Sequence, residues 1–215
     1  MNQTNSPKTV LPTTANHIAN TLRERIVQGV LAGDTPLRQD HVAQEFESSH
    51  VPVREAFQQL EAQGLVVSQP RRGVRVATLS PASVKEALEM RGVLEILAFR
   101  HAAPKFGAPH IEAIEAAQSR CESADSLVAW DSANRDFHRA LVSLCGMPRL
   151  LATLESLEHT NSRHLFAMAH ARGWQPRSNQ DHQLIISAIK SHDVERAVGL
   201  LNRHIGTMER VGFAV

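Results

Sequence analysis

The feature that most constrains the fold is a change in hydrophobic periodicity near Ser80. Before it, three short segments with helical spacing precede two β-branched runs around a Pro/Gly loop. After it, apolar residues recur only at helical spacing. The pattern predicts a mainly α protein with an N-terminal winged helix-turn-helix over residues 15–79 and a six-helix all-α bundle over residues 80–215.

The third helix and the hairpin define the N-terminal half. Pro52 is compatible with the first turn of a helix, and Gly64 is well placed to end it. The predicted hairpin follows, and its loop is Gln69-Pro70-Arg71-Arg72-Gly73. Two earlier helices are predicted near residues 18–29 and 42–46.

Composition excludes several classes of protein. The chain is 42% hydrophobic and 21% charged with a net charge of +1, and no apolar run reaches the ~20 residues of a membrane span. Residues 1–14 lack the apolar core of a signal peptide and predict a disordered tail. Only two cysteines occur, so we expect a cytoplasmic protein without disulfides. Residues 15–79 hold seven basic and seven acidic side chains, so net charge does not indicate nucleic-acid binding.

Six amphipathic segments follow Ser80, and turn residues separate the later ones. The predicted helices cover roughly residues 81–103, 109–123, 126–145, 148–171, 178–191 and 193–211. The breaks are Gly146-Met147-Pro148, Gly173-Trp174-Gln175-Pro176 and Ser191-His192-Asp193.

Histidine is unusually frequent: nine of the twelve histidines follow residue 100. Asn134 and His138 are four residues apart on one helical stripe, and His182 and His204 fall on the stripes of two other helices. A buried histidine is often a hydrogen-bonded core residue. Three on separate stripes, with an asparagine one turn away, fit a divalent metal site better. The other histidines of this half lack such joint placement.

Arg91 also falls on an apolar stripe. It could form an ion pair with Glu95, one turn further on, or bind an effector carboxylate as a bidentate donor. Asn161 and Arg163 are weaker candidates for the same pocket.

The stretch from Ile18 to Val76, with "VPVREAFQQLEAQGLV" and "RRGVRV", resembles the winged helix of the GntR family. The resemblance implies that residues 49–54 open a DNA-recognition helix and that the wing contacts the minor groove. His50, Val51, Gln39 and Asp40 depart from the usual family residues, so a different operator is expected. The implied DNA-binding residues are Ser49, His50, Val51, Pro52, Arg54, Arg71, Arg72 and Gly73.

The segments "NRDFHRALVSLCGMPRLL" and "DHQLIISAIKSHDVERAVGLLNRHI" resemble the FCD effector domain of the FadR subfamily, and six helices resemble its VanR-like branch. Many members hold a divalent metal through Asp or Asn, a histidine four residues later and two further histidines. The resemblance places these ligands at Asn134, His138, His182 and His204. Zn, Ni or Mn is the expected metal, and asparagine makes the ligand set neutral.

These observations predict a transcriptional regulator, a homodimer that binds an inverted-repeat operator in double-stranded DNA and is controlled by a small organic acid. No catalytic residues are expected. One alternative is a metal-dependent enzyme with an N-terminal interaction module, but Asp131, Asp136 and Asp181 do not fall clearly on an inner stripe. The other is a metal-free helical dimerisation domain with core histidines.

Overall fold

The computed structural model describes residues 13–172 and 179–213. The chain divides into two compact units, one of residues up to 26 with 30–78 and one of residues 27–29 with 79 onward. Most of the predicted tail and the predicted break at 173–176 lie outside the described residues. Thr14, which was assigned to the tail, begins the first helix instead.

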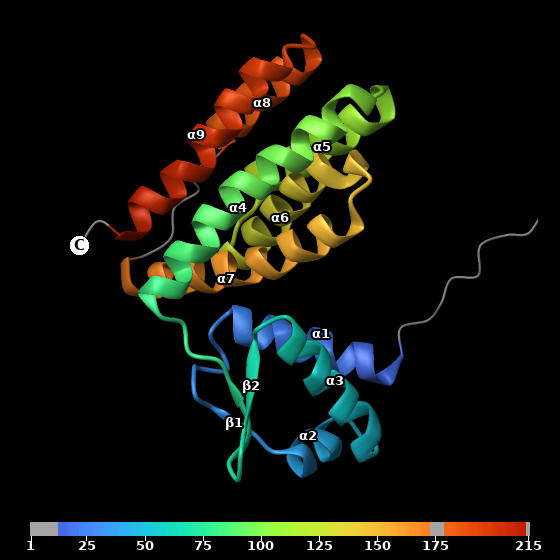
Figure 1. The fold of residues 1–215 in the computed structure, drawn as a ribbon, viewed down its shortest axis with the longest axis vertical. Coiled ribbons are helices and arrows are strands. Elements are labelled where there is room, and N and C mark those ends of the chain that lie inside the picture. The colour runs from blue at the N-terminus through green and yellow to red at the C-terminus, as the bar shows by residue number, and fades with distance from the viewer. Residues whose placement is uncertain (1–12, 173–178, 214–215) are drawn as a thin grey trace, which may run out of the picture. The chain divides into compact units, whose positions relative to one another are not determined.

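The first unit contains three helices and a small antiparallel sheet (Figure 1). This arrangement agrees with the predicted winged helix. Its elements are α1 (Thr14–Val27), β1 (Pro36–Leu37), α2 (Gln39–Glu45), α3 (His50–Ala62), β2 (Val66–Gln69) and β3 (Gly73–Val76).

The sheet has the order β1-β3-β2, and β1 was not predicted. Pro36 lies opposite Arg75 and Leu37 opposite Val74. Proline has no N–H to donate, so it fits a strand at the edge of a sheet. Two residues are too few to show a period, which is why the sequence pattern missed this strand.

The predicted inner stripe of α3 forms the centre of the first core. Val53, Ala56 and Leu60 have no exposed surface, and Phe57 is 6% exposed. They pack with apolar residues of the other elements. The cluster also contains Ile18, Ala19, Leu22, Ile26, Leu37, Val42, Ala43, Leu65, Val66 and Val76.

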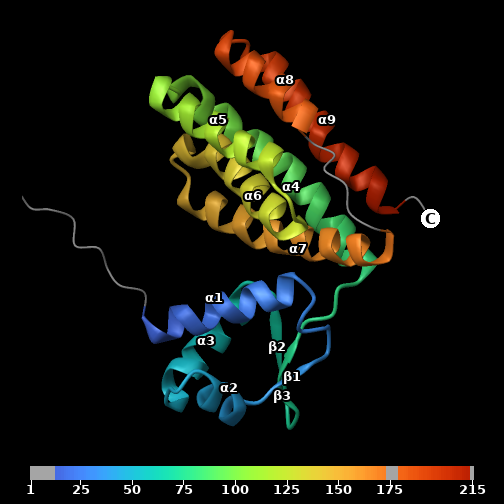
Figure 2. The ribbon, with the colours of Figure 1, turned by 180° about the vertical axis from the view of Figure 1, so that it is seen from behind.

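The second unit is all helical in its described part (Figures 1 and 2). None of the described helices is long and apolar enough to cross a membrane. Its elements are α4 (Pro81–Ala102), the 3₁₀ turn η1 (Ala103–Lys105), α5 (Ala108–Ser123), α6 (Leu127–Val142), η2 (Ser143–Cys145), α7 (Pro148–Arg172), α8 (Asn179–Lys190) and α9 (Val194–Phe213).

Local sequence signals explain where these helices begin and end. Ser80 and Ser83 form a capping box, and Pro81 occupies the first turn of α4, where its missing N–H costs nothing. Gly146 has φ +75° at the end of η2, a left-handed conformation that glycine adopts without strain. The helix bounds therefore lie close to the predicted ones.

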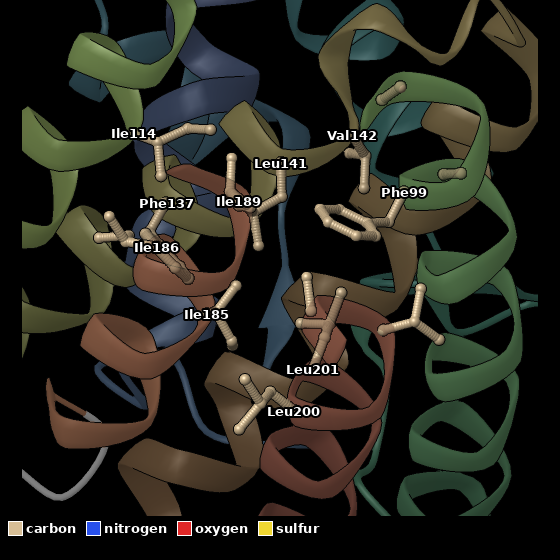
Figure 3. Packing of buried hydrophobic residues seen from close by; sticks show 14 of the residues in the cluster. Phe99, Ile114, Phe137, Leu141, Val142, Ile185, Ile186, Ile189, Leu200 and Leu201 are labelled. Atoms are coloured by element: carbon tan, nitrogen blue, oxygen red, sulfur yellow. The ribbon is translucent and has the colours of Figure 1, made fainter. Parts of the chain in front are cut away.

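The apolar core of the second unit joins all six helices from α4 to α9, with Leu154 as the contribution of α7 (Figure 3). Phe99, Phe137, Leu141 and Ile185 have no exposed surface. Phe137 stacks on the His182 ring with centroids 3.9 Å apart, so this core also orients a histidine.

Leu60→Ala tests the first core. The substitution leaves a cavity in a fully buried position, and we expect it to lower the free energy of unfolding by about 2–5 kcal/mol. Val30→Ala is the control, because Val30 is 70% exposed. Urea unfolding gives both values, and equal losses would contradict the assignment of the core.

Candidate functional site

The N-terminus of α3 presents the first group of candidate residues. Ser49 is the N-cap, and Pro52 lies in the first turn. Val51 is 62% exposed, and His50 and Arg54 are also exposed. Backbone N–H groups of a first helical turn lack partners within the helix, so this end can donate hydrogen bonds to phosphate.

Three positions that depart from the family pattern lie together. The Gln39 side-chain amide donates to the backbone carbonyl of His50 (2.9 Å). The His50 Nδ1 atom is 3.6 Å from the Asp40 carboxylate. The departures therefore change one local surface rather than three separate ones.

The wing turn holds an arginine in an unfavourable conformation. The N–H of Arg72 donates to the carbonyl of Gln69 (3.1 Å), which closes a turn with Pro70 at its second position. Arg71 follows with φ +63° and Gly73 with φ +74°. A left-handed conformation costs a non-glycine residue about 1–2 kcal/mol. Strain of this kind is often found at functional sites.

Arg54 and Arg72 line the same cleft, which has a volume of about 630 Å³ and is bounded by β1, α2, α3 and the wing. The helix and the wing thus contribute arginines to one surface. Arg38, which was not predicted as a site residue, also lines the cleft, and the carboxylates of Asp40 and Glu61 lie there too. The full lining is Pro36, Leu37, Arg38, Gln39, Asp40, Arg54, Phe57, Gln58, Glu61, Ser68, Arg72, Gly73, Val74 and Arg75.

Five arginines of this unit fall into two groups according to their ion pairs. Arg25 pairs with Glu45 and Arg75 with Asp34, whose pKa is lowered by its hydrogen bond to Arg75. The second group consists of exposed arginines that form no ion pair with another described residue. It contains Arg38, Arg54 and Arg71.

Three histidines from different helices meet inside the second unit. His138 on α6, His182 on α8 and His204 on α9 are 1%, 0% and 4% exposed. The Nε2 atom of His204 lies 3.2 Å from Nε2 of His182 and 3.2 Å from Nε2 of His138. The three predicted histidines therefore meet in the structure, and the atom that each ring contributes to the contact is Nε2.

The opposite nitrogen of each ring has a polar partner. His138 Nδ1 donates to Glu95 Oε1 (2.5 Å), and His182 Nδ1 donates to Gln118 Oε1 (2.7 Å). His204 Nδ1 is 3.4 Å from Asp181 Oδ2. These partners fix the proton on Nδ1. The three converging Nε2 atoms then carry lone pairs.

Gln118 makes this tautomer assignment firm. Its Nε2 donates to Glu122 Oε1 (3.0 Å) and to the Asn179 carbonyl (3.4 Å), so its oxygen must be the atom that faces His182. Gln118 could not be predicted from the sequence, because a single glutamine on an apolar stripe has no distinctive spacing.

Burial keeps the three imidazoles neutral. Desolvation lowers the pKa of His138 and of His182, and it lowers the pKa of His204 to about 3. Desolvation disfavours the charged form of a base because the interior cannot replace its hydration. Neutral imidazole is the form that binds a metal ion.

The donor set fits a metal ion on two observations. A metal ion with two imidazole nitrogens at about 2.0–2.1 Å holds them about 2.9–3.4 Å apart, depending on the angle between them, and the observed separations are 3.2 Å. Asn134 is 4% exposed, and its Oδ1 atom is buried with no hydrogen-bond partner among the described residues. Buried polar atoms normally have partners, so this oxygen, one turn before His138, is a plausible fourth donor.

Arg91 and Glu95 form a buried ion pair, with Arg91 Nε 2.9 Å from Glu95 Oε2. This is the pairing that the sequence left open. Burial opposes the ionisation of Glu95, but His138 and Arg91 together lower the pKa of this carboxyl to about 2. Glu95 is therefore ionised and contacts both the arginine and a candidate ligand.

Polar residues make up much of the buried surface of α7, which packs on α4 and α6, beside the apolar Leu154 and Phe166. Asn161 and Arg163 are buried there as candidates from the sequence, and burial lowers the pKa of Arg163. Burial also raises the pKa of Glu158 to about 7. This helix thus buries more polar side chains than an ordinary core does. Its buried polar residues are Glu158, His159, Asn161, Ser162 and Arg163.

One sequence expectation about this region was wrong. Asp131 is 2% exposed, although it was not expected on an inner stripe, and it accepts from Ser162 (2.8 Å) and pairs with Arg135 (3.0 Å). The error arises because α6 contacts neighbours on several sides, so its buried arc is wider than one stripe.

Comparison with known proteins agrees with this architecture. Residues 14–76 match the gntR family of bacterial regulatory proteins, and residues 86–207 match the FCD domain. A probable D-xylose utilization operon transcriptional repressor of Paenarthrobacter nicotinovorans is 30% identical over 90% of this chain and 86% of that protein. The transcriptional repressor GlaR of Escherichia coli strain K12 is 26% identical over 86% of this chain and 90% of that protein.

The fold also matches solved structures. McbR/YncC of E. coli superimposes with a TM-score of 0.78, at 21% identity, over 94% of this chain and 98% of that one. The FCD domain is consistent with the FadR subfamily. The family and its named relatives are transcriptional regulators rather than enzymes, which sets aside the enzyme alternative. The chain belongs to the GntR family of DNA-binding transcriptional regulators, with an FCD domain as its C-terminal unit.

Proposed function

We propose that this regulator is a cytoplasmic homodimeric repressor whose operator affinity is controlled by a small organic acid bound near a divalent metal ion. The observation that supports the proposal best is the convergence of three buried Nε2 lone pairs. Three acceptors without a donor between them repel one another, and a cation at their centre removes that repulsion.

The metal ligands would be Asn134 Oδ1 and the Nε2 atoms of His138, His182 and His204. When bound, a divalent transition metal such as Zn, Ni or Mn supplies a positive centre with positions open to an anionic ligand. Glu95, Gln118 and Asp181 would hold the three rings in place through Nδ1.

The effector would be a small carboxylate. Arg91 uses Nε for Glu95, so its two terminal nitrogens would be the atoms that meet the effector. Asn161 and Arg163 are among the buried polar residues of α7, which packs against the helix that carries Arg91. The region thus offers cationic and amide donors to an anion.

On DNA, the exposed residues 49–54 would enter the major groove, and the wing residues Arg71, Arg72 and Gly73 would contact the minor groove. A twofold dimer would then bind an inverted repeat, because its two helices are related by the same symmetry as the half-sites. The effector would alter operator affinity only through its different affinity for the two states of the dimer.

Selection of bound DNA from a random pool tests this function. We expect an enriched inverted repeat, and candidate organic acids should change its recovery from metal-loaded protein but not from chelated protein. An unenriched pool would refute operator recognition. Enrichment that no acid alters, in a panel of mono-, di- and hydroxycarboxylates, would refute control by a carboxylate.

Substitution of the exposed arginines should separate binding from folding. We expect Arg54→Ala to weaken operator binding, by ~1–3 kcal/mol of discrimination if it contacts a base. Arg71→Gly should weaken binding while leaving stability unchanged or raising it by up to about 1 kcal/mol, because glycine relieves the left-handed strain.

Fluorescence anisotropy with the selected operator and urea unfolding provide the two measurements. Arg149→Ala is the control, since Arg149 is exposed on α7 in the other unit. Unchanged operator affinity in both variants would place DNA recognition elsewhere on the protein.

Removing two ligands should abolish metal binding. Wild-type protein that has been chelated and then incubated with Zn²⁺ or Ni²⁺ should retain stoichiometric metal after gel filtration. The double variant His138→Ala, His204→Ala should retain none, whereas His101→Ala alters an exposed histidine and should bind normally. Stoichiometric metal in the double variant would refute the ligand assignment.

Acid should destabilise the metal-free protein through its buried histidines. Each has a folded-state pKa below its value of 6.5 in the unfolded chain, so only the unfolded state gains a proton as pH falls below about 6.5. His204 should therefore contribute up to about 1.4 kcal/mol of lost stability per pH unit between pH 6 and 4. The free energy of unfolding is measured by urea at each pH. His204→Gln should remove the contribution of His204 to the pH dependence, whereas His101→Gln should not. The same pH dependence in the wild type and both variants would contradict the burial of a neutral His204.

A further inference from the structure

The proposed ligand set has an electrostatic deficit. Asn134 and the three imidazoles are all neutral donors, so a divalent ion at their centre would keep its full charge in a buried site. Burying an unpaired charge is costly unless an opposite charge lies close by. Charge compensation therefore requires an anion close to the ligands.

Glu95 is the buried carboxylate in direct contact with a ligand. Its Oε1 accepts from His138 Nδ1 at 2.5 Å, on the side of the ring opposite to Nε2. Two other carboxylates near the ligands are engaged differently: Asp131 pairs with Arg135, and Asp181 is about half exposed at 3.4 Å from His204. Glu158 is buried, but its nearest ion-pair partner is Arg139 at 3.5 Å.

Arg91 cancels only part of this charge, although its guanidinium also acts on the rings of His182 and His204. Its Nε donates to Oε2, whereas Oε1 accepts from His138 Nδ1. Arg91 also interacts electrostatically with Glu158 and Asp131, so its charge is shared among several carboxylates.

We propose that Glu95 is the positioning residue of the metal centre and supplies, through His138, the negative charge that Asn134 lacks as a ligand. A carboxylate hydrogen-bonded to the far nitrogen of a ligating imidazole raises the basicity of the ring and fixes its orientation. The inference rests on the proposed metal centre. It assigns Arg91 the further task of holding Glu95 toward His138.

The test measures the affinity of the full-length protein for Zn²⁺ by competition with a chromophoric chelator. Glu95→Gln keeps an oxygen for His138 but removes the charge, and we expect at least a tenfold loss of affinity. Glu158→Gln is the matched control, because it makes the same change in another buried glutamate that interacts with Arg91. Its affinity should stay within about threefold of the wild-type value.

Asn134→Asp separates charge compensation from a purely structural role. It places the missing charge directly in the ligand set, so it should tighten Zn²⁺ binding. In the Asn134→Asp background, Glu95→Gln should lower the Zn²⁺ affinity by less than about threefold, because the charge that it removes is no longer needed. A loss of the same size in both backgrounds would overturn charge compensation.

Folding of each variant is checked by circular dichroism and gel filtration. If Glu95→Gln alone does not fold because Arg91 loses its partner, Arg91→Met with Glu95→Gln removes both charges, and it should show the same tenfold loss and the same rescue by Asn134→Asp. A wild-type protein that binds no Zn²⁺ would overturn the metal centre and this inference together. If the wild-type protein binds Zn²⁺ and the Glu95→Gln variant binds it equally tightly, the inference about Glu95 is overturned but the metal centre is not.

Discussion

The second unit depends on the burial of three neutral imidazoles that point the same nitrogen at one place. Water is excluded from them by the apolar core on one side, where Phe137 stacks on His182. Hydrogen-bond acceptors on the other side hold the ring protons. Without those acceptors the rings could rotate or change tautomer, and the lone pairs would no longer converge. The apolar packing and the polar contacts therefore specify the same arrangement.

This arrangement links helices that are distant in sequence. His138 lies on α6, His182 on α8 and His204 on α9, and Glu95 adds α4 to the set. α4 begins at Pro81, directly after the last strand of the winged helix in the chain. His138 thus hydrogen-bonds, at 2.5 Å, to the helix that follows the DNA-binding unit in the chain.

Helical periodicity made much of this structure predictable. Inner stripes identified His138, His182, His204 and Arg91 as buried, since one face of each helix carries them among apolar neighbours. The pattern could not show that Gln118 or Glu95 would meet a particular ring, because such contacts join helices and depend on packing. It also missed β1 and the burial of Asp131. A two-residue strand has no period, and a helix with neighbours on several sides buries more than one stripe.

The balanced charge of the first unit has a consequence for how it binds DNA. Acidic partners neutralise Arg25 and Arg75, and Asp40 and Glu61 line the same cleft as Arg54 and Arg72. Affinity from phosphate contacts grows with the number of phosphates that are neutralised, and it falls steeply with salt. A surface with few uncompensated cations gains little from that source. In the proposed binding mode, its affinity would come mainly from the fit of a helix N-terminus and a wing to their grooves, and recognition would rest on the few side chains that reach the bases.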